Sequence, residues 1–231
     1  LLAATVLALA WANSPWSDSY GSLLERSITI GSGSDAFHLT VHEFVNDVLM
    51  AVFFLVVGLE IKRELFVGEL RDRRTATLPV LAAIGGMVVP ALVYVALNVG
   101  TSTARGWGIP MATDIAFALG VLTIFSARIP PSLKLFLLSL AVVDDVGAIV
   151  VIAVFYSSSV SLGWLVVAVG VLVLMLVLRA LRVATVVPYL LVGAVAWYCM
   201  FRSGVHATIA GVAIGFLIPL APMRPAATSM A

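Results

Sequence analysis

The sequence predicts an all-α membrane protein with about eight transmembrane helices. Of its 231 residues, 62% are hydrophobic and only 11% are charged, whereas a soluble domain has roughly 25% charged residues. The hydrophobic residues form long runs separated by short charged segments. Because about 20 apolar residues in a helix span the hydrocarbon core of a bilayer, the chain is expected to cross a membrane several times.

The composition also argues against several classes of function. The formal net charge of +1 gives no basis for nucleic-acid binding. The single cysteine, Cys199, lies in an apolar run, and the three histidines form no zinc motif. The sequence has no glycine-rich phosphate loop of the kind that ATP-driven pumps use. We therefore expect no bound cofactor.

The first apolar segment, residues 1–14, is expected to be a membrane helix that the chain enters partway along. It faintly resembles the end of a signal peptide, but it lacks the basic leader of such a peptide. Residues 17–43 are polar and rich in glycine and serine. Short β-branched runs around Gly31 to Gly33 favour a β-hairpin outside the membrane, and an irregular loop is the alternative.

Seven further apolar segments are predicted to span the membrane. The second runs from about Phe44 to Leu59, with Asp47 near its start and Glu60 directly after it. A strongly charged segment separates it from the third span. The third to eighth spans are expected at residues 77–98, 106–125, 135–156, 162–178, 183–201 and 203–223.

The basic residues predict the orientation of these spans. With the N-terminus on the cytoplasmic side, ten of the 13 Lys and Arg residues fall on the inside. Only Arg26, Arg105 and Arg202 fall outside. Cytoplasmic loops of membrane proteins carry an excess of basic residues, so this arrangement is the expected one.

The fifth span carries two adjacent carboxylates, Asp144 and Asp145, in an otherwise uncharged run. A charge at the centre of a bilayer costs about 2.5–3.5 kcal/mol even on the mildest scale, so such residues are usually functional. Successive helical residues point about 100° apart, so only one of the two can face a given cavity directly. We expect the pair to carry protons or bind a cation. The alternative is that both stay protonated or paired and only hold helices together.

The fourth span is predicted to be broken. Pro110 removes a backbone donor and disfavours helix at the preceding residue, and Thr113 and Asp114 follow closely. Broken helices at membrane depth are tolerated where they line a cavity, and they offer free backbone groups there. Polar backbone beside Asp114 and Asp145 would form an oxygen-lined site suited to a hard cation such as Na⁺ or Li⁺. Asp47 is a weaker candidate, since it can also reach the outer headgroups.

Several long motifs resemble those of the NhaA sodium/proton antiporters of bacterial inner membranes. They occur in the family's order at residues 46–65 (NDVLMAVFFLVVGLEIKREL), 82–92, 112–120 (ATDIAFALG), 142–156 (VVDDVGAIVVIAVFY) and 203–220. The resemblance implies an inverted-repeat antiporter fold. Residues 1–231 would form a single transmembrane domain with the N-terminal two thirds of the family's length, so the fold would be incomplete. We expect the chain to be a fragment or the product of a truncated gene.

The resemblance also implies roles for individual residues. Asp145 would be the main Na⁺/H⁺ carrier, and Asp144 would help it to hold Na⁺ transiently. Thr113 and Asp114 match the polar centre of the broken helix, and Asp47 matches a cavity-lining carboxylate. The residues that match pH-sensing positions are Glu60, Arg63, Glu64 and His206. The first three have the i, i+3, i+4 spacing of ordinary helix-end ion pairs, which is the alternative for them.

The function that the resemblance implies is export of Na⁺ or Li⁺ in exchange for external protons, activated at alkaline pH. Such a protein is a secondary active transporter and not an enzyme. It would lie in the bacterial inner membrane as a multi-pass protein in contact with lipid, as a homodimer joined through residues 17–43. Two alternatives are a truncated, non-transporting structural or regulatory membrane protein and an intramembrane aspartyl protease. The YD and GxGD motifs of such proteases do not occur here.

Overall fold

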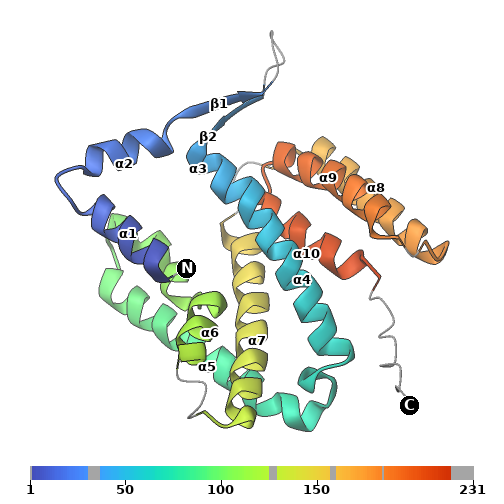
Figure 1. Ribbon diagram of the computed structural model, residues 1–231, viewed down its shortest axis with the longest axis horizontal. Helices are drawn as coiled ribbons and strands as arrows, with labels where there is room; N and C mark the ends of the chain where they lie inside the picture. The colour runs from blue at the N-terminus through green and yellow to red at the C-terminus, as the bar shows by residue number, and fades with distance from the viewer. Residues whose placement is uncertain (1, 31–36, 125–128, 157–159, 184, 220–231) are drawn as a thin grey trace, which may run out of the picture.

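The computed structural model describes residues 2–30, 37–124, 129–156, 160–183 and 185–219. Helices dominate these residues, as Figure 1 shows. Five helices in the described ranges are long and apolar enough to cross a membrane: Val41–Phe66, Arg73–Asn98, Ser132–Phe155, Leu162–Ala180 and Val186–Ser203. The prediction of an all-α polytopic membrane protein is therefore confirmed.

The other predicted spans coincide with shorter helices. α1 (Leu2–Ala12) and α10 (Ala207–Leu217) have 11 residues each, which corresponds to about 16 Å of helix against a hydrocarbon core of about 30 Å. Residues 220–223 of the predicted eighth span lie outside the described residues. The eight predicted spans thus correspond to five long helices, two short ones and one interrupted segment.

The interrupted segment is the predicted fourth span. It begins as the 3₁₀ helix η3 (Ser102–Met111), continues without helix through Ala112 to Asp114, and ends as α6 (Ile115–Ile124). The predicted break at Thr113 and Asp114 is present. It leaves backbone N–H and C=O groups without helical partners, and those groups must find partners elsewhere.

The polar segment before the second span folds into a helix and a hairpin. α2 covers Ser17–Leu24, which the sequence analysis did not anticipate. β1 (Ser27–Ile30) then pairs antiparallel with β2 (Phe37–Thr40). Gly31 to Gly33, around which a hairpin was predicted, lie outside the described residues. Thr40 ends β2 and caps the next helix in a reciprocal capping box with Glu43, so the hairpin leads directly into the membrane helix.

The second span is one continuous helix with a local change of winding. It starts as α3 (Val41–Glu43), widens into the π-helical segment η1 (Phe44–Leu49), and continues as α4 (Met50–Phe66). Short π-helical segments inside α-helices occur frequently at functional sites. Here the widened turn contains Asp47.

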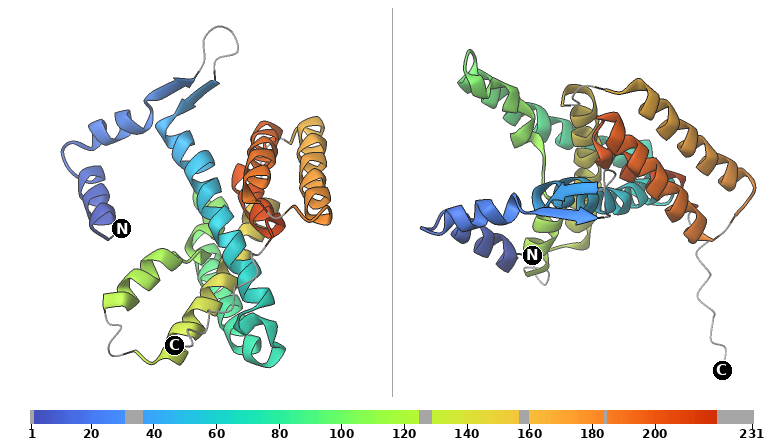
Figure 2. Two further views of the ribbon diagram at one scale, coloured as in Figure 1. Left: turned by 45° about the vertical axis from the view of Figure 1, so that its right-hand side comes forward. Right: turned by 90° about the horizontal axis from the view of Figure 1, so that it is seen from above.

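The long helices lie side by side in an order that differs from their order in the chain. α7 (Pro131–Phe155) contacts α5 (Arg73–Asn98) on one side and α4 on the other. α4 also packs along α10, which contacts α9 (Val186–Ser203), and α9 pairs with α8 (Leu162–Ala180). Figures 1 and 2 show α4 and α7 at the centre, with α8 and α9 beyond α10.

Glycines allow α4 and α10 to approach closely. A Cβ atom on Gly58 would lie 2.6 Å from the carbonyl oxygen of Val212, and one on Gly215 would lie 2.6 Å from that of Leu55. A Cβ atom on Gly211 would collide with the backbone of Ala51. Gly211 and Gly215 have the GxxxG spacing of close-packed membrane helices. This contact was not among the features predicted from the sequence.

Two clusters of buried residues connect this helix pair to its neighbours. The larger joins α8, α9 and α10 through Ala168, Met175, Tyr189, Cys199, Met200, Ala210, Ile214 and Ile218. The smaller joins α4 and α7 through Val57, Ile61 and Val142. Val142 lies two residues before Asp144. The smaller cluster therefore holds the part of α7 that carries the carboxylate pair against α4.

Candidate functional site

The two carboxylates of the fifth span face the protein interior. α7 begins at Pro131, a residue that suits the first turn of a helix because it needs no N–H partner there. Asp144 and Asp145 lie near the middle of this helix and are only 2% and 8% exposed. Neither side chain is therefore turned toward the hydrocarbon.

The broken fourth span meets this pair. The backbone N–H of Thr113 donates a hydrogen bond to Oδ2 of Asp144 at 3.0 Å. That N–H is available because the chain is not helical from Ala112 to Asp114. Charge-assisted bonds of this kind are roughly twice as strong as neutral ones. The break thus supplies a partner for one of the two buried carboxylates.

The side chains of Asp114 and Thr113 are exposed, and the two residues make different hydrogen bonds. Oδ1 of Asp114 accepts a hydrogen bond from the N–H of Phe117 at 2.9 Å, so Asp114 caps the start of α6. Its charge also acts on Asp145. Thr113 contributes its backbone rather than its hydroxyl to the contact with Asp144.

Asp145 is the carboxylate of this site whose hydrogen bonding is incomplete in the described part of the chain. Its Oδ2 atom is buried and has no hydrogen-bond partner among the described residues. The charges that act on Asp145 from the described residues are those of Asp144 and Asp114, both negative. A buried carboxylate in such surroundings is costly unless a proton or a cation neutralises it.

Asp47 and His206 lie near enough to interact electrostatically, although they were predicted as separate candidates. Asp47 is half-buried in the π-helical segment, and its carbonyl oxygen accepts a hydrogen bond from Nε1–H of Trp197 at 2.9 Å. His206 precedes α10 and lies close enough for its charge to act on the Asp47 carboxylate. Its Nδ1 atom is buried without a partner in the described part of the chain. These two residues lie far from the carboxylates of α7 in the sequence.

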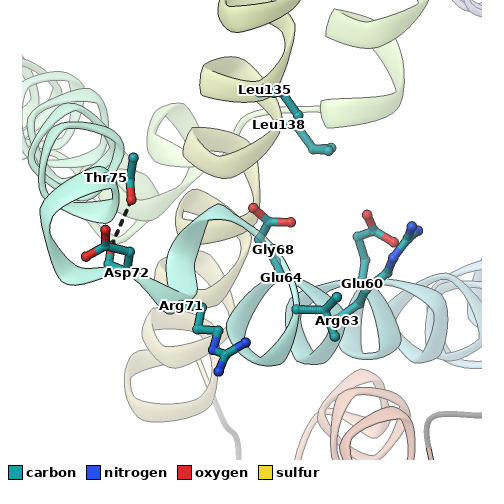
Figure 3. A pocket seen from close by; sticks show the side chains of 10 residues that line it. Glu60, Arg63, Glu64, Gly68, Arg71, Asp72, Thr75, Leu135 and Leu138 are labelled. Carbon is teal, nitrogen blue, oxygen red and sulfur yellow. Dashed lines mark hydrogen bonds between the residues drawn. The ribbon is translucent and has the colours of Figure 1, made fainter. Parts of the chain in front are cut away.

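The three predicted pH-sensing residues at the end of α4 line one pocket, with a volume of about 790 Å³. Figure 3 shows Glu60, Arg63 and Glu64 on one side of this pocket and Leu135 and Leu138 of α7 on the other. The remaining lining residues are Val67, Gly68, Arg71, Asp72 and Thr75. The pocket therefore lies between the charged end of α4 and the first half of the helix that carries Asp144 and Asp145.

A buried hydrogen bond connects this pocket to α7. Oγ of Ser139 donates to Oε1 of Glu64 at 3.0 Å, and the two residues are 1% and 8% exposed. Ser139 lies five residues before Asp144 on the same helix. Glu64 could be predicted as a site residue but Ser139 could not, because nothing in the local pattern marks a serine that faces another helix.

Lys62 is a second residue that the sequence analysis missed. Its side chain is only 2% exposed, and its Nζ donates a hydrogen bond to the carbonyl oxygen of Ile218. Ile218 directly follows α10, where helix carbonyls lack intrahelical partners and favour a positive charge. The sequence placed Lys62 in the charged segment after the second span, with no signal that it points inward.

Replacing Ser139 by alanine is expected to destabilise the complete protein by about 1.5 kcal/mol, because a buried hydrogen bond to a carboxylate is lost. The check is the midpoint of thermal aggregation of the protein in detergent. Ser132→Ala on the exposed start of α7 is the matched control and should leave the midpoint unchanged. Equal midpoints for the two variants would contradict the role of this bond.

A family model described as "Na+/H+ antiporter 1" matches residues 1–231. The chain is 55% identical over 219 residues to the Na⁺/H⁺ antiporter NhaA of Oleidesulfovibrio alaskensis, covering 95% of this chain and 49% of the relative. It is 50% identical over 225 residues to Na⁺/H⁺ antiporter NhaA 3 of Frankia alni, covering 97% and 49%. For the NhaA of Helicobacter pylori HPAG1 the identity is 50% over 215 residues, covering 93% and 49%.

The chain thus spans about half the length of these curated relatives, less than the two thirds that the resemblance implied. The alignments nevertheless cover 93–97% of this chain. With one family model matching it from end to end, the chain belongs to the Na⁺/H⁺ antiporter 1 family.

Proposed function

We propose that the complete protein is a secondary active transporter that exchanges Na⁺ for protons across the bacterial inner membrane. One observation carries the proposal: the buried Oδ2 atom of Asp145 has no partner among the described residues, beside a broken membrane helix. The relatives are named as Na⁺/H⁺ antiporters, which supports the same activity.

The mechanism we propose is competition for Asp145. Burial makes the bare carboxylate costly, and either a proton or a Na⁺ ion removes that cost. Both cannot occupy the same oxygen atoms at once, so binding of one releases the other. If the helices rock so that the site opens alternately to the two faces, exchange follows without a chemical reaction. No catalytic group and no cofactor is needed.

The neighbouring groups would complete the cation site. Asp144 is held by the N–H of Thr113 and stays beside Asp145. The non-helical backbone from Ala112 to Asp114 offers oxygen atoms, which are the ligands that hard cations prefer. The same ligands suit Li⁺ as well as Na⁺, so we propose that both ions are transported.

Regulation by pH is assigned to two groups of residues. The first is Glu60, Arg63 and Glu64, which line a pocket connected to α7 through Ser139. The second is Asp47 with His206, because His206 acts electrostatically on the Asp47 carboxylate. We propose that Asp47 lines the ion pathway and that activity rises at alkaline pH.

The partners we propose are lipid and a second copy of the chain. The two-stranded sheet of β1 and β2 has strand edges that can pair with those of another molecule. We place residues 17–43 on the periplasmic side, as the distribution of basic residues predicts.

The test uses the complete protein in proteoliposomes with an imposed proton gradient. Addition of NaCl is expected to dissipate the gradient, and addition of choline chloride is the control that should leave it unchanged. A gradient that responds equally to both salts, in vesicles with correctly inserted protein, would overturn the proposed exchange.

A further inference from the structure

Tyr156 ties the end of α7 to the interrupted fourth span. It directly follows the last residue of α7, and its hydroxyl makes two hydrogen bonds to backbone groups of η3. Oη accepts from the N–H of Gly108 at 2.9 Å and donates to the carbonyl oxygen of Arg105 at 2.7 Å. One hydroxyl therefore satisfies a donor and an acceptor on the same short segment.

Side-chain packing reinforces these bonds. The ring of Trp107, between the two bonded residues, packs edge-on against Phe155 with centroids 5.1 Å apart. Its centroid lies 6.2 Å from that of Tyr156. A Cβ atom on Gly108 would lie 2.8 Å from the Tyr156 hydroxyl, so a glycine at this position permits the close approach of backbone and ring.

The same segment is attached to α7 at a second point. Five residues after Gly108, the N–H of Thr113 donates to Asp144, which lies twelve residues before Tyr156 on the same helix. The stretch from Gly108 to Thr113 is thus bonded at both ends to one helix. A short segment held at both ends retains few conformations, so the position of one end restricts the other.

We propose that Tyr156 is a positioning residue for the cation site. Its hydroxyl holds η3 so that the Thr113 N–H lies against Asp144 and the non-helical backbone stays beside Asp145. Tyr156 does not touch the cation, and it acts through the segment that it holds. This inference rests on the proposed function, because it concerns the same site.

The test compares the complete wild-type protein with Tyr156→Phe, which keeps the ring and removes both hydrogen bonds. Hydrogen–deuterium exchange of peptides covering residues 102–114 is expected to become faster. In proteoliposomes, the KM for Na⁺ is expected to rise about five- to tenfold, which corresponds to the loss of one or two neutral hydrogen bonds. The maximal rate at saturating Na⁺ should change less than twofold.

Tyr94→Phe provides a matched control. Tyr94 lies on α5, and its hydroxyl donates to the carbonyl oxygen of Thr103 at 3.0 Å, also in η3. Since α5 carries no site aspartate, this variant is expected to leave the KM unchanged. If Tyr156→Phe alters the KM no more than Tyr94→Phe does, or lowers only the amount of folded protein, the positioning role is wrong.

Hydrogen–deuterium exchange separates this inference from the proposed function. If the wild-type protein moves no protons in response to Na⁺, the proposed function fails. Faster hydrogen–deuterium exchange at residues 102–114 in Tyr156→Phe would still show that Tyr156 holds η3. If the wild-type protein transports Na⁺ and Tyr156→Phe matches it in both measurements, the positioning role fails and the proposed function stands.

Discussion

Replacing Asp145 by asparagine in the complete protein is expected to abolish the proposed Na⁺-dependent proton movement. Asparagine has nearly the same shape as aspartate but carries no charge and cannot exchange a proton in the working pH range. The variant can therefore bind neither the proton nor the Na⁺ ion, whose competition for Asp145 drives the proposed exchange. The measurement is Na⁺-induced collapse of a respiration-generated ΔpH in everted membrane vesicles, which should fall to the level of vesicles without the protein.

Stability distinguishes loss of function from loss of fold in this variant. Because Oδ2 of Asp145 is buried without a partner among the described residues, a neutral side chain of the same shape should not destabilise the protein. We expect the thermal midpoint in detergent to be equal to that of the wild type or higher. Asp47→Asn, in a half-buried position, should reduce exchange much less. Normal exchange by Asp145→Asn would defeat the assignment.

The second large effect is expected at the contact between α4 and α10. Gly211→Ala would place a Cβ atom against the backbone of Ala51, which cannot move aside as a flexible side chain can. Overpacking of a close contact lowers the free energy of unfolding by about 1–3 kcal/mol. We expect the upper end of this range because the added Cβ would meet backbone atoms rather than a movable side chain. The expected result is a lower thermal midpoint and less monodisperse protein after extraction in detergent.

Gly170→Ala is the matched control for this substitution. Gly170 lies within α8, and apart from the adjacent backbone of α8 no heavy atom of the described chain lies within 4 Å of the position that its Cβ would occupy. Both substitutions bring the same gain in helix propensity, about 1 kcal/mol. The difference in thermal midpoint between the two variants therefore measures the effect of the contact between α4 and α10 alone. Equal midpoints would show that α4 and α10 do not pack as closely as described.

The apolar spans and the break could be predicted because both depend on local chemistry. A run of apolar residues must be helical in lipid, since every backbone group needs a partner there. Pro110 and the polar residues after it disfavour a continuous helix on their own. The buried aspartates stood out for the same reason, because a charge in an apolar run is costly whatever surrounds it.

The helical segment α2 and the π-helical turn at Asp47 could not be predicted in this way. α2 is short and polar, and the sequence indicated only that residues 17–43 lie outside the membrane. The π-helical turn changes the winding over six residues without any change in composition. In both cases, several backbone conformations suit the same residues.

The sequence by itself determined that this chain is a polytopic membrane protein of an antiporter family, with acidic residues at membrane depth and one interrupted span. Only the tertiary structure decided which groups meet: the N–H of Thr113 and Asp144, Ser139 and Glu64, Lys62 and Ile218, and Tyr156 and η3. The physical reason is that lipid selects helices by composition alone, segment by segment. Which faces of those helices meet depends instead on side-chain shape and hydrogen bonding between residues distant in the chain.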